Sequence, residues 1–128
     1  MADRKLKRAR LLERVRTVEK LGAARASAEA EALSSRLFGV AEKTRRLASH
    51  YAGSEGLATA ADLARQLAMR QQLHVLGALS DNHFHDAQRR ADAALVQLGD
   101  AERKRSRIEG DRRELEREIG ARIWARSA

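Results

Sequence analysis

The stretch Tyr51-Ala-Gly-Ser-Glu-Gly-Leu57 separates two long helical patterns and decides the fold of this chain. Gly53 and Gly56 can adopt the positive φ values that close one helix and reverse the chain. Thr59, with Asp62 three residues later, has the pattern of a helix N-cap with a partial capping box. We therefore expect a helix over 3–52, a hinge over 53–58 and a helix over 59–126. The alternative is one rod with a flexible break.

Composition indicates an all-α protein. The chain of 128 residues has no proline and 34% charged residues, whereas aromatic residues make up only 3%. This composition is typical of long helices and coiled coils, so we predict an antiparallel two-helix coiled-coil hairpin with one domain and a thin core. The second helix should be the longer one, with roughly its last one or two dozen residues running past the N-terminus.

The cellular setting follows from what the sequence does not contain. It has no cysteine, and its basic start is not followed by an apolar signal core. No apolar run approaches the roughly 20 residues that a membrane-spanning helix needs. A cytoplasmic protein is the plain interpretation.

The net charge of +8 is concentrated at the two ends of the chain. Residues 1–16 carry seven Lys and Arg against two acids, and residues 103–126 carry nine against five. Between them, residues 17–102 are nearly neutral. A hairpin brings the two ends together, so one pole should be strongly basic and should bind an acidic partner.

Apolar spacing predicts where the first helix packs. Leu11, Val15, Val18 and Gly22 follow a 4-3-4 rhythm that indicates an amphipathic seam. After a one-residue phase change the rhythm continues to the hinge, through Ala26, Ala30, Leu33, Leu37, Val40, Thr44, Leu47 and Tyr51.

The second helix begins with the most hydrophobic stretch of the chain and ends in a regular heptad. Leu63, Leu67, Leu73 and Leu76 need a covering helix or partner. Gly77 and Ser80-Asp81-Asn82 leave open a kink or break near 77–82. The heptad then comprises Ala91, Ala94, Leu98, Ala101, Arg105, Ile108, Arg112, Leu115, Ile119 and Arg122. Because a buried unpaired guanidinium is costly, this end should be either splayed and solvated or docked on an acidic partner.

The sequence offers no chemistry typical of an enzyme. Among the four histidines, only His85 stands four residues from an acid, Asp81, and one such pair does not make a metal site. We expect no catalytic residues, no cofactor, no metal and no small-molecule substrate. Ile123 and Trp124 are equally compatible with a partner anchor and with an ordinary helix end.

The stretch Ala101-Glu-Arg-Lys-Arg-Ser-Arg-Ile-Glu-Gly-Asp-Arg-Arg-Glu114 resembles the FliJ-type flagellar export proteins, the coiled-coil stalks of type III export ATPases. The resemblance implies a non-enzymatic stalk or adaptor of a flagellar or virulence-type system, cytoplasmic and peripheral to the membrane export apparatus. It implies a partner at each end, an export ATPase ring and the cytoplasmic part of an export gate, and export chaperones are further candidates. By position, the ATPase contact falls on Arg4, Lys5, Lys7, Arg8, Arg10, Arg103, Lys104 and Arg105. The gate contact falls on Leu47, Tyr51, Leu63 and Leu67.

Two other functions remain open from the sequence. The cations between Arg4 and Arg16 could bind nucleic-acid phosphates, although Asp3 and Glu13 interrupt them and no aromatic residue is there for base stacking. A homodimeric structural coiled coil without a dedicated partner is the third interpretation.

Overall fold

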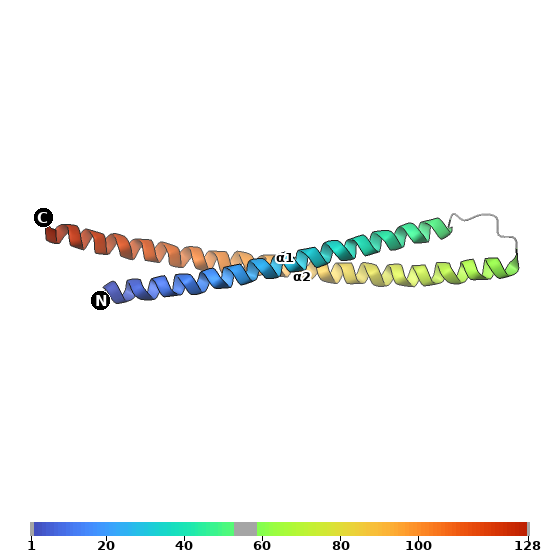
Figure 1. The fold of residues 1–128 in the computed structure, drawn as a ribbon, viewed down its shortest axis with the longest axis horizontal. Helices are drawn as coiled ribbons and strands as arrows, with labels where there is room; N and C mark the ends of the chain where they lie inside the picture. Colours follow the sequence, from blue (N-terminus) through green and yellow to red (C-terminus); the bar gives the residue numbers. More distant parts are fainter. Residues whose placement is uncertain (1, 53–58, 128) are drawn as a thin grey trace. The chain divides into compact units, whose positions relative to one another are not determined.

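The computed structural model describes residues 2–52 and 59–127, which form two helices, α1 (Ala2–Ala52) and α2 (Ala60–Ser127) (Figure 1). The fold is all-α, an antiparallel two-helix hairpin with the longer helix second, as the sequence predicts. The hinge expected over 53–58, with its two glycines, lies outside the described residues.

The start of α2 confirms the predicted N-cap. The backbone N–H of Asp62 donates to the Thr59 hydroxyl at 3.1 Å, and the N–H of Leu63 donates to the Thr59 carbonyl at 3.2 Å. The first bond satisfies an amide group that the first helical turn leaves without a partner, and the second is the first i→i−4 bond of the helix. The chain therefore enters α2 at a position that Thr59 determines.

α2 is continuous through residues 77–82, so the break considered there does not occur. These small and polar residues serve helix packing instead. Ser80 is buried, Gly77 faces the Thr44 side chain, and Asp81 accepts a hydrogen bond from Arg45 at 2.9 Å. Contacts across the helix pair thus offset the low helix propensity of this stretch.

Packing divides the chain into two units, each made of one segment of α1 and one of α2. Unit 1 comprises residues 1–28 and 93–128, and unit 2 comprises residues 29–92. In unit 1 the antiparallel pairing is marked by ion pairs of Arg10 with Glu116 and of Lys20 with Glu102. In unit 2 it is marked by Arg45 with Asp81.

The residues of α1 that pack in unit 1 are not the predicted ones. Leu11, Val15, Val18 and Gly22 are exposed, and the predicted change of phase is absent. The less exposed positions instead follow an unbroken 3-4 spacing, through Leu6, Ala9, Glu13, Arg16, Lys20, Ala23 and Ser27. The prediction followed the large apolar side chains, whereas small residues and charges with a partner line the contact.

The same spacing continues in the α1 segment of unit 2, where the prediction is half correct. Its less exposed positions are Ala30, Ser34, Leu37, Ala41, Thr44, Ala48 and Tyr51. Every second predicted position falls on this seam. The alternate ones, Ala26 of unit 1 and Leu33, Val40 and Leu47 of unit 2, are exposed.

In α2 the predicted heptad is correct from Ala91 to Ile119, because every predicted position in that range is partly buried, whereas Arg122 is exposed. The apolar stretch at its start behaves differently. Only Leu73 is buried there, and Leu63, Leu67 and Leu76 are about half exposed. Their seam neighbours are small or polar, namely Gln66, Ser80 and Ala87.

The extra length of α2 was predicted to lie at its C-terminal end, beyond the N-terminus of α1, and this prediction is wrong. Ala2 and Asp3 line one hollow together with Ile119, Ile123 and Arg126, so α2 does not run a dozen residues past the N-terminus. In unit 2 the Tyr51 carbonyl, near the end of α1, accepts a 2.7 Å bond from Gln66 Nε2, which lies in the second turn of α2. The first turn of α2 therefore accounts for part of the difference in length between α2 and α1.

The core is thin, as expected from the composition. Among the described residues, the buried hydrophobic ones are Ala41, Leu73 and Ala87, and none of the large side chains is fully enclosed. Phe38 and Phe84 add an edge-on contact in unit 2, with ring centroids 5.3 Å apart. Because burial stabilises in proportion to apolar area, helix propensity must carry an unusually large share of the stability, and the ion pairs add modestly to it.

Gly77→Ala should stabilise the protein. A Cβ at this position would lie 3.8 Å from Thr44 Cγ2, an ordinary contact distance, while the helix gains about 0.5–1 kcal/mol from replacing glycine. Thermal unfolding followed by circular dichroism measures the change. Gly39→Ala, where a Cβ meets no atom within 4 Å, is the matched control and should stabilise similarly. A loss of stability for Gly77→Ala alone would mean that the helices approach more closely than described here.

Candidate interaction surfaces

The seam of unit 1 contains charged side chains that pair across the two helices. Arg112 of α2 donates to Glu13 of α1, and its other guanidinium nitrogen donates to Glu116 at 3.0 Å. Glu116 also accepts from Arg10 at 3.3 Å. Arg112 and Glu13 are only about a fifth exposed, so this cluster replaces an apolar layer of the seam.

A second cluster lies further along unit 1. Lys20 of α1 approaches Glu102 at 2.8 Å, and Arg105 bonds Glu102 at 2.9 Å and Glu109 at 3.0 Å. Glu109 also pairs with Arg113 at 2.6 Å. Each carboxylate thus serves two cations, and the cluster joins both helices.

These clusters correct the expectation for the seam arginines. Arg105 and Arg112 are neither splayed into solvent nor dependent on an outside acid, since carboxylates of the same chain neutralise them. The signal was present in the sequence, because glutamates four residues away, at 109 and 116, are neighbours of these arginines on a helix, but the prediction did not consider them as partners. Only Arg122 is exposed as expected.

The pairing shifts the pKa values of the groups involved. Hydrogen bonds from Arg105, and then from Lys20, lower the pKa of Glu102 to about 2. The bond from Arg112 is the main reason that the pKa of Glu116 is lowered, and the same pairings raise the pKa of Arg105 and Arg112. All four groups stay charged at neutral pH.

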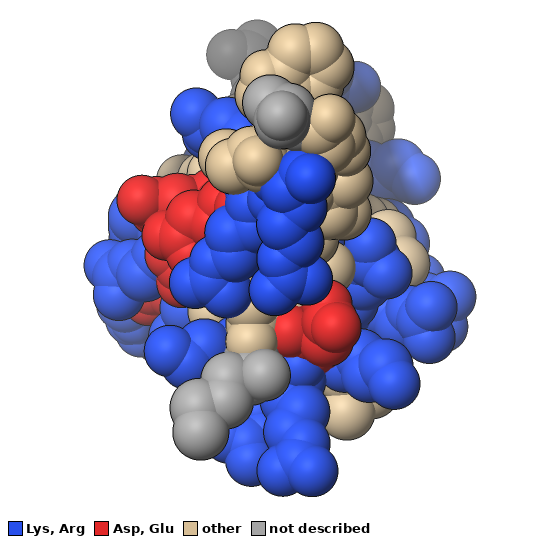
Figure 2. Space-filling model, turned by 90° about the vertical axis from the view of Figure 1, so that its left-hand side faces the viewer, with Lys and Arg blue, Asp and Glu red and all other residues tan. Residues whose placement is uncertain are grey.

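The residues expected to contact an ATPase all lie in unit 1, but they fall into two kinds. Arg10, Arg103 and Arg105 are held in ion pairs by Glu116, Asp100 and Glu102. The others are exposed and form no ion pair within the described part of the chain: Arg4, Lys5, Lys7, Arg8 and Lys104. Figure 2 faces the end that carries both termini and shows Lys and Arg over most of the visible surface.

These cations do not form one cluster. Lys5 and Arg8 line a groove opposite Leu115 and Glu118 of α2. Arg103 follows Glu102, which pairs with Lys20, about four turns along α1 from Lys5. The N-terminal cations therefore lie beside the last turns of α2, and residues 103–105 lie beside the middle of the α1 segment.

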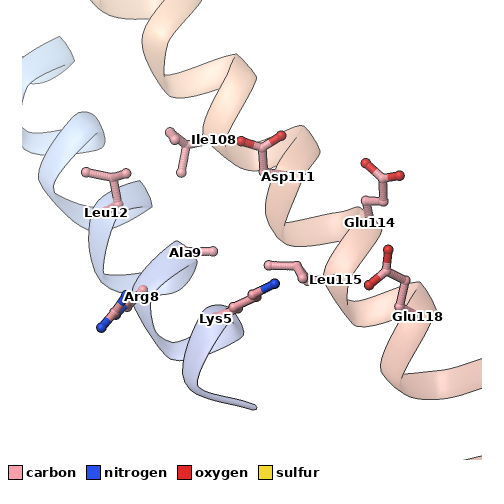
Figure 3. Close-up of a pocket in the computed structure, with 9 residues that line it drawn as sticks. All are labelled: Lys5, Arg8, Ala9, Leu12, Ile108, Asp111, Glu114, Leu115 and Glu118. Carbon is pink, nitrogen blue, oxygen red and sulfur yellow. The ribbon is translucent and has the colours of Figure 1, made fainter. Parts of the chain in front are cut away.

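The groove beside Lys5 and Arg8 was not predicted. It measures about 500 Å³, and Ala9, Leu12, Ile108 and Leu115 form its apolar floor (Figure 3). Lys5 and Arg8 stand on its α1 side and Asp111, Glu114 and Glu118 on its α2 side. Like charges spaced three or four residues apart on each helix, basic on α1 and acidic on α2, were visible in the sequence, but placing the two rows beside one groove required the correct seam.

The residues expected to contact an export gate all lie in unit 2. Leu47, Leu63 and Leu67 are about half exposed, and Leu67 lines a hollow of about 950 Å³ with Ala48, His74 and Val75. Tyr51 is partly buried, and its carbonyl accepts bonds from Gln66 and Arg70. The three leucines are available to a partner, whereas Tyr51 mainly holds the end of α1.

The described residues contain no group of three or more His, Cys, Asp or Glu arranged to hold a metal ion. Neither described helix is long and apolar enough to cross a membrane. The surfaces available for function are thus the exposed cations, the exposed leucines and the open grooves.

Comparison with known proteins finds no match for this chain among protein-family models, curated proteins or solved structures. The resemblance to the FliJ-type export proteins therefore depends on the sequence pattern alone. A function must be argued from the surfaces themselves.

Stability should fall at acid pH, with Glu102 contributing to the fall. A carboxyl whose folded pKa is about 2 stabilises the fold above its unfolded value near 4.5, and this contribution disappears as pH falls between those values. Glu102→Gln should flatten the dependence of melting temperature on pH in that range, and added salt should weaken the effect because the site is open to solvent. Glu19→Gln, whose carboxylate pairs only within α1, is the control and should leave most of the slope.

Proposed function

We propose that this protein is a non-enzymatic coiled-coil stalk or adaptor of a flagellar or type III protein export apparatus, linking an export ATPase ring to the export gate and assisting substrate export. One observation carries the proposal. Unpaired cations gather near the start of α1 in unit 1, and half-exposed leucines gather near the start of α2 in unit 2.

The cations of unit 1 support an acidic protein partner. Internal ion pairs neutralise the charges of the seam, while Arg4, Lys5, Lys7 and Arg8 are left unpaired within less than two turns of α1. Four cations so close together repel one another, and a surface of carboxylates relieves that repulsion. The acidic face of a ring-shaped ATPase is the partner that the sequence resemblance implies.

The leucines of unit 2 support a second, more apolar partner. Leu63, Leu67, Leu76 and Leu79 lie within the first six turns of α2 and are each about half exposed. Exposed apolar side chains grouped on one segment mark a docking surface more often than chance does. A partner that covers them gains buried area without disturbing the seam, because Leu73 and Gln66 hold the seam there.

Binding also suits the shape of the described surfaces better than catalysis does. The hollows are open grooves along the helix pair. A reaction needs reactive groups converging in a site sheltered from water. An adaptor needs accessible side chains at separate places, and this chain has them.

The ATPase contact can be tested with Arg4→Glu combined with Lys7→Glu, two exposed cations that do not line the groove of unit 1. Binding to a purified flagellar export ATPase, measured by calorimetry, should weaken at least about tenfold, because two attractive contacts become repulsive. The matched control is Arg36→Glu with Arg65→Glu, which changes the net charge equally with exposed residues of unit 2. Equal binding by both variants would contradict the proposal.

The same proteins distinguish nucleic-acid binding. Affinity for random duplex DNA that falls steeply between about 50 and 200 mM salt, with no measurable affinity for the ATPase, would replace the adaptor with a phosphate-binding coiled coil.

Leu67→Asp should abolish binding to the cytoplasmic part of an export gate without unfolding the protein. A half-exposed side chain can accept a charge, while a partner that covers it cannot. Pull-down with the purified gate domain and circular dichroism measure the two properties. Leu21→Asp, at an exposed leucine of unit 1, should leave gate binding intact, and Leu73→Asp, at the buried seam, should unfold the helices. If Leu67→Asp unfolded the protein, Leu67 would be needed for the core, and its role as a gate contact would be contradicted.

A further inference from the structure

The two flanks of the unit 1 seam differ in how their charges are used. On one flank the charges are paired across the helices, as in Arg10 with Glu116 and Lys20 with Glu102. On the other flank, Lys5 and Arg8 of α1 and Asp111, Glu114 and Glu118 of α2 form no ion pair within the described residues. Charges of both signs therefore stand unpaired along one groove.

The floor of this groove is apolar and only partly covered. Leu12 is 38% exposed, while Ala9, Ile108 and Leu115 are partly buried. An apolar strip between two charged rows is the surface that a helix of another chain packs on, with its own charges pairing at the edges. The cations of the groove are on α1 and the carboxylates are on α2 (Figure 3). A partner helix must therefore carry acidic side chains where it faces α1 and basic side chains where it faces α2.

We propose that the groove of unit 1 binds the same groove of a second copy of this chain, forming a twofold dimer whose symmetry axis runs parallel to the helices. Each basic α1 row then lies on the acidic α2 row of the other copy. The proposal does not depend on the export function. It concerns residues that the ATPase test above leaves unchanged.

Charge selects this symmetry over the alternative. Two grooves that face each other can be related by an axis along the helices or by one across them. The axis across the helices places α1 on α1 and so sets Lys5 and Arg8 against the cations of the other copy. The axis along the helices places α1 on α2, antiparallel, and sets cations against carboxylates.

The positions of the charges along the helix axis also match between the two copies. Lys5 and Glu118 stand at one end, and Leu12 and Ile108 stand at the other (Figure 3). Rotation about an axis along the helices preserves these levels, so Lys5 of one copy meets Glu118 of the other, and Leu12 meets Ile108. The result is a four-helix layer in which every neighbouring pair of helices is antiparallel, a common bundle arrangement.

Charge reversal tests the dimer with the full chain. The first variant combines Lys5→Glu and Arg8→Glu, which makes both rows acidic, and the second combines Asp111→Lys and Glu118→Lys, which makes the α2 row predominantly basic. Each variant alone should dimerise about 100-fold more weakly than wild type in sedimentation equilibrium, because like charges face each other. An equimolar mixture of the two should form a heterodimer, identified by native mass spectrometry, since every acidic row then meets a basic one.

The mixture makes the test independent of folding, which circular dichroism of each variant confirms separately. Arg36→Glu with Arg65→Glu, the control outside the groove, should dimerise like wild type. Wild-type protein that is monomeric up to about 100 µM, or a mixture that stays monomeric while wild type dimerises, overturns the proposal. Variants that dimerise as strongly as wild type overturn it as well.

Discussion

The seam between the two helices is the constraint on which the rest of the structure depends. In both units it follows an unbroken alternation of three and four residues, and its members are mostly small, polar or charged. In unit 2, the buried residues of the seam include Ala41, Thr44, Ser80 and Ala87. Small side chains allow the backbones to approach closely but bury little area, so the seam specifies register more than it supplies stability. Many large apolar side chains, such as Leu11, Val15 and Leu33, consequently lie outside it.

In unit 1 the seam keeps its register through ion pairs. Arg112 and Arg105 occupy positions where a coiled coil usually carries leucine, and Glu13, Glu102, Glu109 and Glu116 neutralise them. Such pairs are open to solvent and contribute modestly to stability, but a shift of register would break those that cross the helices, namely Arg112 with Glu13, Lys20 with Glu102 and Arg10 with Glu116. Polar seam residues in coiled coils specify alignment in this way. The charges that the seam does not use are then free to act on other molecules.

The proposed functions depend on exposed side chains that lie outside the seam. The unpaired cations near the start of α1, the half-exposed leucines of α2 and the groove with two opposite rows of charge differ in chemistry, and Lys5 and Arg8 belong both to the cations and to the groove. The exposed faces of each unit present such surfaces. The leucines share no residue with the other two surfaces, whereas an acidic partner and a second copy of the chain would both contact Lys5 and Arg8.

The sequence by itself determined the elements. Absence of proline, high helix propensity, the Thr59 cap and the regular spacing from Ala91 to Ile119 are local properties, and each predicts its helix correctly. Only the tertiary structure decided which stripe of α1 faces α2. Leu11, Val15 and Val18 and the stripe through Glu13 and Lys20 have the same helical spacing, so periodicity cannot choose between them. The choice depends on whether each seam position meets a complementary residue of α2, as Glu13 meets Arg112 and Thr44 meets Gly77. That complementarity joins residues far apart in the chain, and it also decided which cations are neutralised and which remain free to bind a partner.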